Sequence, residues 1–218
     1  MATALIKGED GQVAELARAR AGLHSLLARV FSAAPTAELL KGVKDPEVLS
    51  SLAACGIAFD EEFLSGGVEE QIRELAAEFT RLFIGPGPHI APFESVFVRS
   101  PGEYQPRLWG GATVAVAGFY EEAGLRFHGS QIPDHLGLEF EAMAALARAE
   151  AESRESGDRE EAGRLLELER RFCREHLLRW APDLCLAVER ETTSGFYRGM
   201  AALARTLVMM PGEEDSII

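Results

Sequence analysis

Apolar residues recur along most of this chain at the three- and four-residue spacing of an α-helix. One such amphipathic pattern runs from Val13 to Val30, with arginines at intervening positions. The alternation of apolar and polar residues typical of a half-buried β-strand occurs only in the short stretch ESVFVRS, residues 94–100. We therefore expect an all-α protein, a single globular helical bundle of irregular arrangement that spans residues 1–218.

Capping residues and helix breakers indicate where the other helices begin and end. Asp45 and Pro46 suit a helix start, whereas Gly85 and Pro86 end the helix that begins near Val68. The expected helices cover residues 36–40, 45–56, 68–83, 111–124, 133 onward, 159–179, 181–190 and 194–209. The linker at 125–132 is a candidate hinge, and exchange of helices about it would give a domain-swapped dimer in place of a monomer.

A long proline-rich loop interrupts the helical pattern between residues 84 and 110, with prolines at 86, 88, 92, 101 and 106. Prolines lower the entropy of the free loop, so little further entropy is lost when it becomes ordered. The loop also carries many large apolar side chains: Ile90, Phe93, Val96, Phe97, Tyr104, Leu108 and Trp109. We expect it either to pack into the core or to line a groove that an apolar ligand enters.

The charge of the chain narrows its choice of partners. It has 22 Lys and Arg against 35 Asp and Glu, a formal charge of −13. Because such a charge repels phosphate groups, we expect no nucleic acid partner and no anionic membrane surface. The first residues, MATALIKGEDGQ, lack the apolar region of a secretory signal, and no apolar run approaches the roughly 20 residues that span a bilayer. We expect a cytoplasmic protein without stable membrane insertion, whose cysteines are reduced.

The sequence contains no recognisable catalytic motif. The Gly-Pro-Gly-Pro at residues 85–88 lacks the lysine of a phosphate-binding loop, and Ser95 lacks the glycines of a nucleophile elbow. His135 and Glu139 are four residues apart and share a helical face. They could bind a metal ion, form a hydrogen bond that fixes the helix start, or present carboxylates at the mouth of a groove to guanidinium groups. We expect no metal, no cofactor and no enzymatic activity.

Two segments carry a more specific pattern. The first is RLFIGPGPHIAPFESVF, and the second, further along the chain, is PDHLGLEFEAMA. Across residues 78–144 the chain resembles the TorD/DmsD family of cytoplasmic chaperones dedicated to molybdoenzymes of the dimethyl sulfoxide and trimethylamine N-oxide reductase type. Two positions depart from the family pattern. Gln131 or Ile132 replaces its glutamate before the proline, and Phe93 stands where tryptophan is frequent.

The resemblance implies a chaperone that binds the twin-arginine signal peptide, or the apoprotein, of a molybdopterin oxidoreductase catalytic subunit. It would hold this client until the cofactor is inserted and before export. The apolar segment of the peptide would pack on loop residues, and acidic side chains would pair with its arginines. The peptide-binding residues expected from the resemblance are Pro92, Phe93, Glu94, Val96, Phe97, Asp134, His135 and Glu139.

Two other functions remain open at this point. One is an assembly factor of the nitrate reductase type, whose client need not carry a twin-arginine signal. The other is a small helical metal-dependent enzyme that uses His135 and Glu139.

Overall fold

The computed structural model describes residues 2–126 and 131–210, with side chains from residue 11 onward. The α-helices are α1 (Ala2–Ser32), α2 (Ala37–Val43), α3 (Pro46–Ala54), α4 (Glu61–Ser65), α5 (Val68–Phe79), α6 (Glu94–Phe97), α7 (Gly111–Glu122), α8 (Leu136–Ser156), α9 (Arg159–Glu175), α10 (Ala181–Glu191) and α11 (Gly195–Met209). A π-helix follows α5 (Thr80–Ile84), and a 3₁₀-helix (Leu177–Arg179) precedes α10. The all-α expectation is confirmed.

Several helices start where the sequence supplies a capping side chain. Thr36 caps α2, Asp45 caps α3 with Pro46 in its first turn, and Asp158 caps α9. At the end of α8, Gly157 adopts a φ of 83°, the left-handed conformation that glycine accepts without strain.

Three local differences from the sequence expectation have simple causes. The five-residue α4 is too short to show periodicity, and the Asp60 side chain caps it. The ESVFVRS stretch begins with one helical turn, α6, so its alternation does not produce a strand. The helix expected over 159–179 ends at Glu175, because His176 leaves the helical conformation with φ −120° and ψ −83°.

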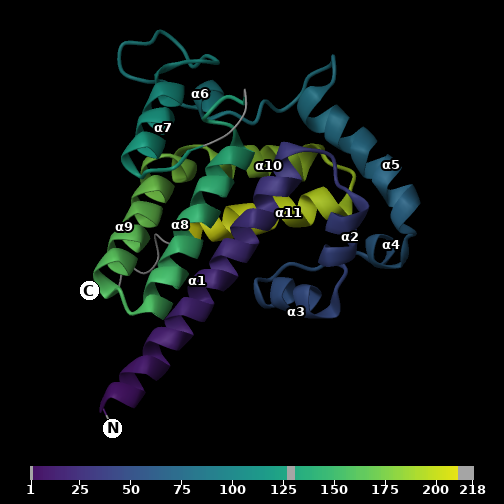
Figure 1. Cartoon of the computed structure of the whole chain (residues 1–218). Coiled ribbons are helices and arrows are strands. Elements are labelled where there is room, and N and C mark those ends of the chain that lie inside the picture. Colours follow the sequence, from purple (N-terminus) through teal and green to yellow (C-terminus); the bar gives the residue numbers. More distant parts are fainter. Residues whose placement is uncertain (1, 127–130, 211–218) are drawn as a thin grey trace.

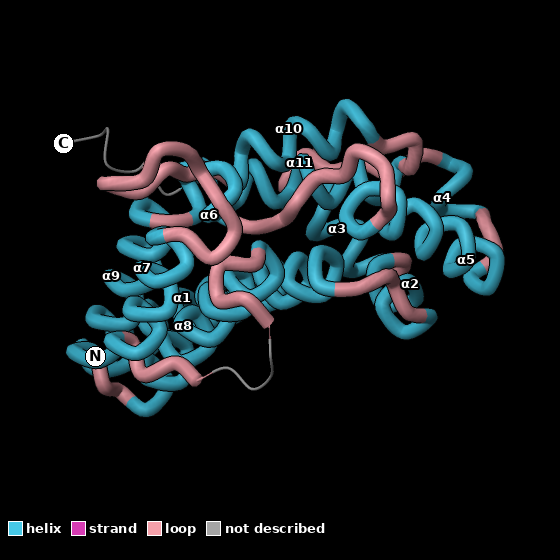
Figure 2. The backbone as a smooth tube through the Cα atoms, turned by 90° about the horizontal axis from the view of Figure 1, so that it is seen from above, coloured by secondary structure: helices cyan, strands magenta, loops and turns pink. Residues whose placement is uncertain are grey.

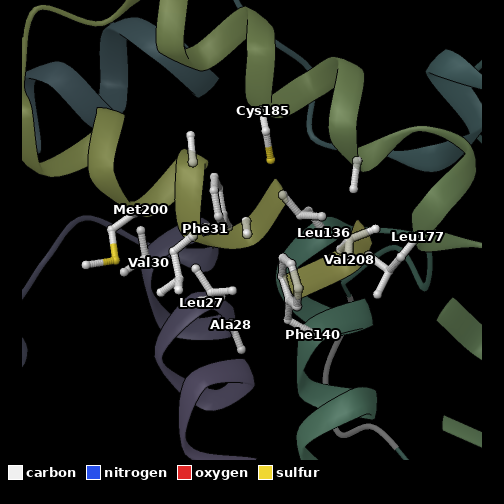
Figure 3. Packing of buried hydrophobic residues seen from close by; sticks show 14 of the residues in the cluster. Leu27, Ala28, Val30, Phe31, Leu136, Phe140, Leu177, Cys185, Met200 and Val208 are labelled. Carbon is white, nitrogen blue, oxygen red and sulfur yellow. The ribbon is translucent and has the colours of Figure 1, made fainter. Parts of the chain in front are cut away.

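The long helices form the centre of the bundle (Figure 1). Helix α1 packs along α8, α9 packs on α8, and α10 and α11 pack as a pair. Seen from above in Figure 2, α2 to α5 lie at the opposite end of the molecule from α7 and α9. Figure 3 shows the shared core: Phe31 of α1 faces Phe140 of α8, and Met200 and Val208 come from α11. The rings of Phe31 and Phe140 stack at 6.3 Å.

A buried ionic cluster links the three longest helices. Arg20 of α1 binds Glu150 of α8 at 2.5 Å and Glu169 of α9 at 3.1 Å. Arg154 also binds Glu150, and His24 lies 3.6 Å from Glu169. Glu150 is fully buried, so its charge is stabilised by these arginines and not by water.

The first part of the proline-rich loop packs into the core, as expected, whereas its role as the wall of a ligand groove stays a prediction. Its root is fixed because the Ile90 amide donates to the Leu82 carbonyl at 2.7 Å, and Leu82 and Phe83 are buried as expected. The second half stays at the surface, where Tyr104 and Trp109 are exposed.

The candidate hinge at 125–132 lies partly outside the described residues. No helix in the described ranges is both long and apolar enough to cross a bilayer.

Candidate functional site

The two motif segments meet in space and bind each other through their main chains. Phe93 and His135 form an antiparallel β-bridge. The Leu136 amide donates to the Pro92 carbonyl at 2.9 Å, and the Glu94 amide donates to the Asp134 carbonyl at 3.0 Å. Residues 92–97 and 133–139 therefore form one unit, here called the motif junction.

Asp134 organises the start of α6 within the motif junction. Its Oδ2 accepts the Ser95 amide at 2.7 Å, and its side chain is fully buried. A carboxylate at this place satisfies an amide that the first turn of a helix leaves unpaired. The aspartate of the second motif thus fixes the conformation of the first.

Two further carboxylates of the junction are buried against the segment between α9 and α10. Glu94 Oε2 lies 2.9 Å from His176 Nδ1, and Arg179 is 3.7 Å from Glu94 Oε1. Glu139 Oε2 accepts the indole N–H of Trp180 at 3.2 Å. Glu94 and Glu139 both have an exposed fraction of 0%. These contacts attach the motif junction to the end of α9.

The concentration of buried acids changes the proton affinity of nearby groups. Burial, and then the neighbouring Glu94, raise the pKa of Glu139 well above its ordinary value. Burial also raises the pKa of the Tyr120 hydroxyl, with contributions from Glu139 and Asp134. The Tyr120 hydroxyl donates to the Pro133 carbonyl at 3.0 Å, which fixes the start of the second motif.

His135 caps α8 with its ring nitrogen. Nδ1 accepts the Gly137 amide at 3.0 Å, and the ring packs edge-on against Phe93 at 5.1 Å. Burial lowers the pKa of His135 to about 4, so the ring is neutral at pH 7, as an accepting nitrogen requires. Gly137 is needed here because a Cβ would lie 2.0 Å from the Ser32 hydroxyl oxygen of α1.

The exposure expected for the carboxylates is wrong. Glu94, Asp134 and Glu139 do not stand at the mouth of a groove, because each binds a partner inside the protein. The expected His135–Glu139 hydrogen bond is also wrong, since the two side chains have the separate partners given above. Among the other expected residues Pro92 is buried, Phe93, Phe97 and His135 are half-buried, and Val96 is exposed.

His176 and Trp180 were not among the expected site residues. Both lie on the apolar stripe of the 159–179 pattern, which indicates core packing and nothing more. Their polar atoms form hydrogen bonds with residues far away along the chain, so no local sequence spacing predicts these contacts. The available signal was a histidine and a tryptophan on an otherwise apolar stripe, two residue types that need a hydrogen-bond partner when buried.

The surface beside the motif junction is hollow, and the hollow has a mixed polar and apolar lining. A cavity of about 620 Å³ is lined by Phe119, Glu122, His176 and Arg179, among others. Nearby, α6, α7 and the loop between them expose large apolar side chains, here called the loop face: Val96, Tyr104, Leu108, Trp109 and Val114. In Figure 1 this loop stands above the start of α7.

Trp109 is held in an unusual conformation. Its φ of 62° lies in the left-handed region, which a bulky side chain rarely adopts. Its ring is 62% exposed, so burial of the ring does not explain the strain. Strained residues of this kind are concentrated at binding sites.

The all-helical fold of the chain has a counterpart among solved structures. It is similar to the crystal structure of a candidate redox enzyme maturation protein from Archaeoglobus fulgidus, with a TM-score of 0.52 over 88% of this chain and 92% of that chain, at 20% identity. No curated protein matches the chain. The family model described as "Nitrate reductase delta subunit" matches residues 61–186, more than half of the sequence. The chain belongs to this TorD-like family of redox enzyme maturation chaperones.

Side chains of the described ranges do not bring three His, Cys, Asp or Glu residues together in a group that could hold a metal ion. His135 and Glu139, the pair considered for a metal, are engaged with Gly137 and Trp180.

Proposed function

We propose that the protein is a dedicated chaperone for the catalytic subunit of a molybdopterin oxidoreductase. It binds the N-terminal twin-arginine signal peptide, or the apoprotein, and holds it until cofactor insertion and before export. The observation that carries this proposal is the exposed apolar loop face, fixed from below by the motif junction. Several large apolar side chains exposed along one short segment are candidates for a binding surface.

The loop face suits the apolar stretch of such a peptide. Burial of apolar surface contributes roughly 25 cal/mol per Å². Tryptophan and tyrosine, which dominate binding energies at interfaces, are represented by Trp109 and Tyr104. Trp109 is 62% exposed, so most of its apolar surface is available for a peptide to cover. Binding of this kind requires no covalent chemistry.

The eight residues expected to bind the peptide take two roles in this proposal. Phe93, Val96 and Phe97 contact its apolar segment. The buried members, Pro92, Glu94, Asp134 and Glu139, together with His135, hold the loop in place. Asp134 is buried against the Ser95 amide, so direct pairing with the client's arginines requires the motif junction to open. That prediction requires that Asp134→Asn weaken binding and reduce its salt dependence.

Calorimetric titration with a designed peptide tests the proposal. The probe has two adjacent arginines followed by an apolar stretch of leucine and alanine. Val96→Asp and Trp109→Ser should each weaken binding by about tenfold or more, since a charge or a lost ring removes apolar contact. Leu186→Asp on α10, which also replaces an exposed apolar residue, is the matched control and should bind like the wild type. Equal affinity of all four proteins would contradict the proposal.

A second candidate is an assembly factor of the nitrate reductase type, favoured by the description of the matching family. Its client would bind the same loop face without a need for paired arginines. Replacement of both arginines of the probe by lysines separates the candidates. A twin-arginine chaperone loses affinity, whereas the second candidate binds both peptides alike.

A further inference from the structure

A second cavity, of about 670 Å³, lies between α4, α5 and the segment that leads into α11. We call it the α4–α5 pocket. Five acidic residues line it: Asp60, Glu62, Glu70, Glu74 and Glu78. Arg81 is the one cation among the described residues that line it.

That arginine is already engaged. Arg81 binds both carboxylate oxygens of Glu78, at 2.7 and 2.8 Å, and donates to the Glu191 carbonyl at 2.7 Å. At the rim, Lys44 donates to the Gly66 carbonyl. In the part of the chain that the structure describes, Glu70 and Glu74 form no ion pair. The pocket therefore has a surplus of negative charge that its own cations do not balance.

A buried side chain in the same pocket has one polar atom without a hydrogen-bond partner. Gln71 lines the cavity and is 6% exposed. Its Nε2 donates to the carbonyls of Phe63 at 2.7 Å and Glu62 at 3.4 Å, which fixes the orientation of the amide. Its Oε1 is left buried without a hydrogen bond. An unpaired acceptor among carboxylates calls for a ligand that donates hydrogen bonds and carries positive charge.

Two buried aromatic residues form part of the pocket wall. The rings of Phe63 and Phe196 pack at 5.4 Å from each other, and Lys44 Nζ lies 5.0 Å from the centre of the Phe63 ring. Asp60 is fixed because Oδ1 caps α4 and the carboxylate lies against Gly195, where a Cβ would be 2.0 Å from Oδ2. A guanidinium group donates several hydrogen bonds in one plane to fixed carboxylates and carbonyl oxygens, which an ammonium group does not.

We propose that the α4–α5 pocket binds an arginine side chain of a peptide. The identification of this peptide as the client's basic segment rests on the proposed function. Helices α4 and α5, which line the pocket, lie on the other side of the bundle from α6 and α7 in Figure 1. The protein would then contact a client at two places, with apolar groups at one and an arginine at the other.

The first test uses the pocket alone. N-acetyl-arginine methylamide and its lysine counterpart are titrated into ¹⁵N-labelled protein, and the amide signals of Gly66, Gly67 and the Gln71 side chain are followed. The arginine probe should shift these signals more than the lysine probe. A double variant, Glu70→Gln with Glu74→Gln, should weaken the binding by about tenfold. Absence of a shift, or an equal shift in the double variant, would overturn the proposal.

The second test separates this inference from the proposed function. Glu121→Gln with Glu152→Gln, two exposed glutamates on α7 and α8, is the charge-matched control. The twin-arginine peptide should bind the control like the wild type and the pocket variant about tenfold more weakly. If the arginine probe binds and the peptide does not, the client assignment fails and the pocket stands. If the peptide binds the pocket variant with full affinity, the pocket inference fails and the proposed function stands.

Discussion

The main chain of Phe93 lies antiparallel to that of His135 and forms a β-bridge with it. This bridge joins the proline-rich loop to the start of α8, so neither segment can move without the other. The carboxylate of Asp134, beside the bridge, caps the turn that carries Val96. The conformation of an exposed apolar surface is thus set by a buried polar contact.

The capping contact of Asp134 predicts a difference between two substitutions. Asp134→Ala leaves the buried Ser95 amide without an acceptor and should lower the free energy of unfolding by about 1–3 kcal/mol. Asp134→Asn keeps an oxygen in the same place and should lose less. Urea denaturation of both variants measures the difference. Equal destabilisation by the two variants would show that the hydrogen bond to Ser95 contributes little.

His135 predicts a dependence of stability on pH. Its pKa is about 4 in the folded protein and near 6.5 when unfolded, so between these values the unfolded chain binds more protons. Its contribution to stability is present above pH 6.5 and falls as the pH drops toward 4, by a total on the order of 3 kcal/mol. Asn is a good helix cap that does not titrate, so His135→Asn should remove this component.

The measurement compares urea midpoints of the wild type and His135→Asn from pH 7 to pH 4. Other acidic groups, such as Glu78 with its pKa lowered to about 2 by Arg81, titrate in both proteins and cancel in the difference. Parallel pH profiles would contradict the assignment of a buried neutral ring.

The buried cluster around Arg20 predicts a large loss of stability on substitution. Arg20→Met leaves Glu150 and Glu169 buried without this partner and should cost about 3–5 kcal/mol. Arg18 lies on α1, as Arg20 does, and forms an exposed ion pair with Glu155 of α8. Arg18→Met removes this pair and should cost less than about 1 kcal/mol. Thermal unfolding gives both values, and a similar small loss for the two variants would refute the structural role of the cluster.

The fold was predictable from sequence because helical periodicity and capping residues are local signals. Asp45–Pro46 and Gly85–Pro86 mark helix ends without reference to distant residues. The motif resemblance also identified segments that meet in space. The partners of their carboxylates were not predictable. Glu94 contacts His176, and Glu139 contacts Trp180, across long stretches of chain. Acids that seemed available for a ligand are therefore occupied within the protein.

The central claim is that the client's apolar segment binds to the loop face and covers its exposed aromatic side chains. The two tryptophans of the chain make this measurable, because Trp109 is 62% exposed and Trp180 is fully buried. Titration with the twin-arginine peptide should shift the tryptophan emission to shorter wavelength in the wild type, and the shift should be absent in Trp109→Phe. A shift of the same size in Trp109→Phe, or peptide binding by calorimetry without any shift in the wild type, would contradict the account.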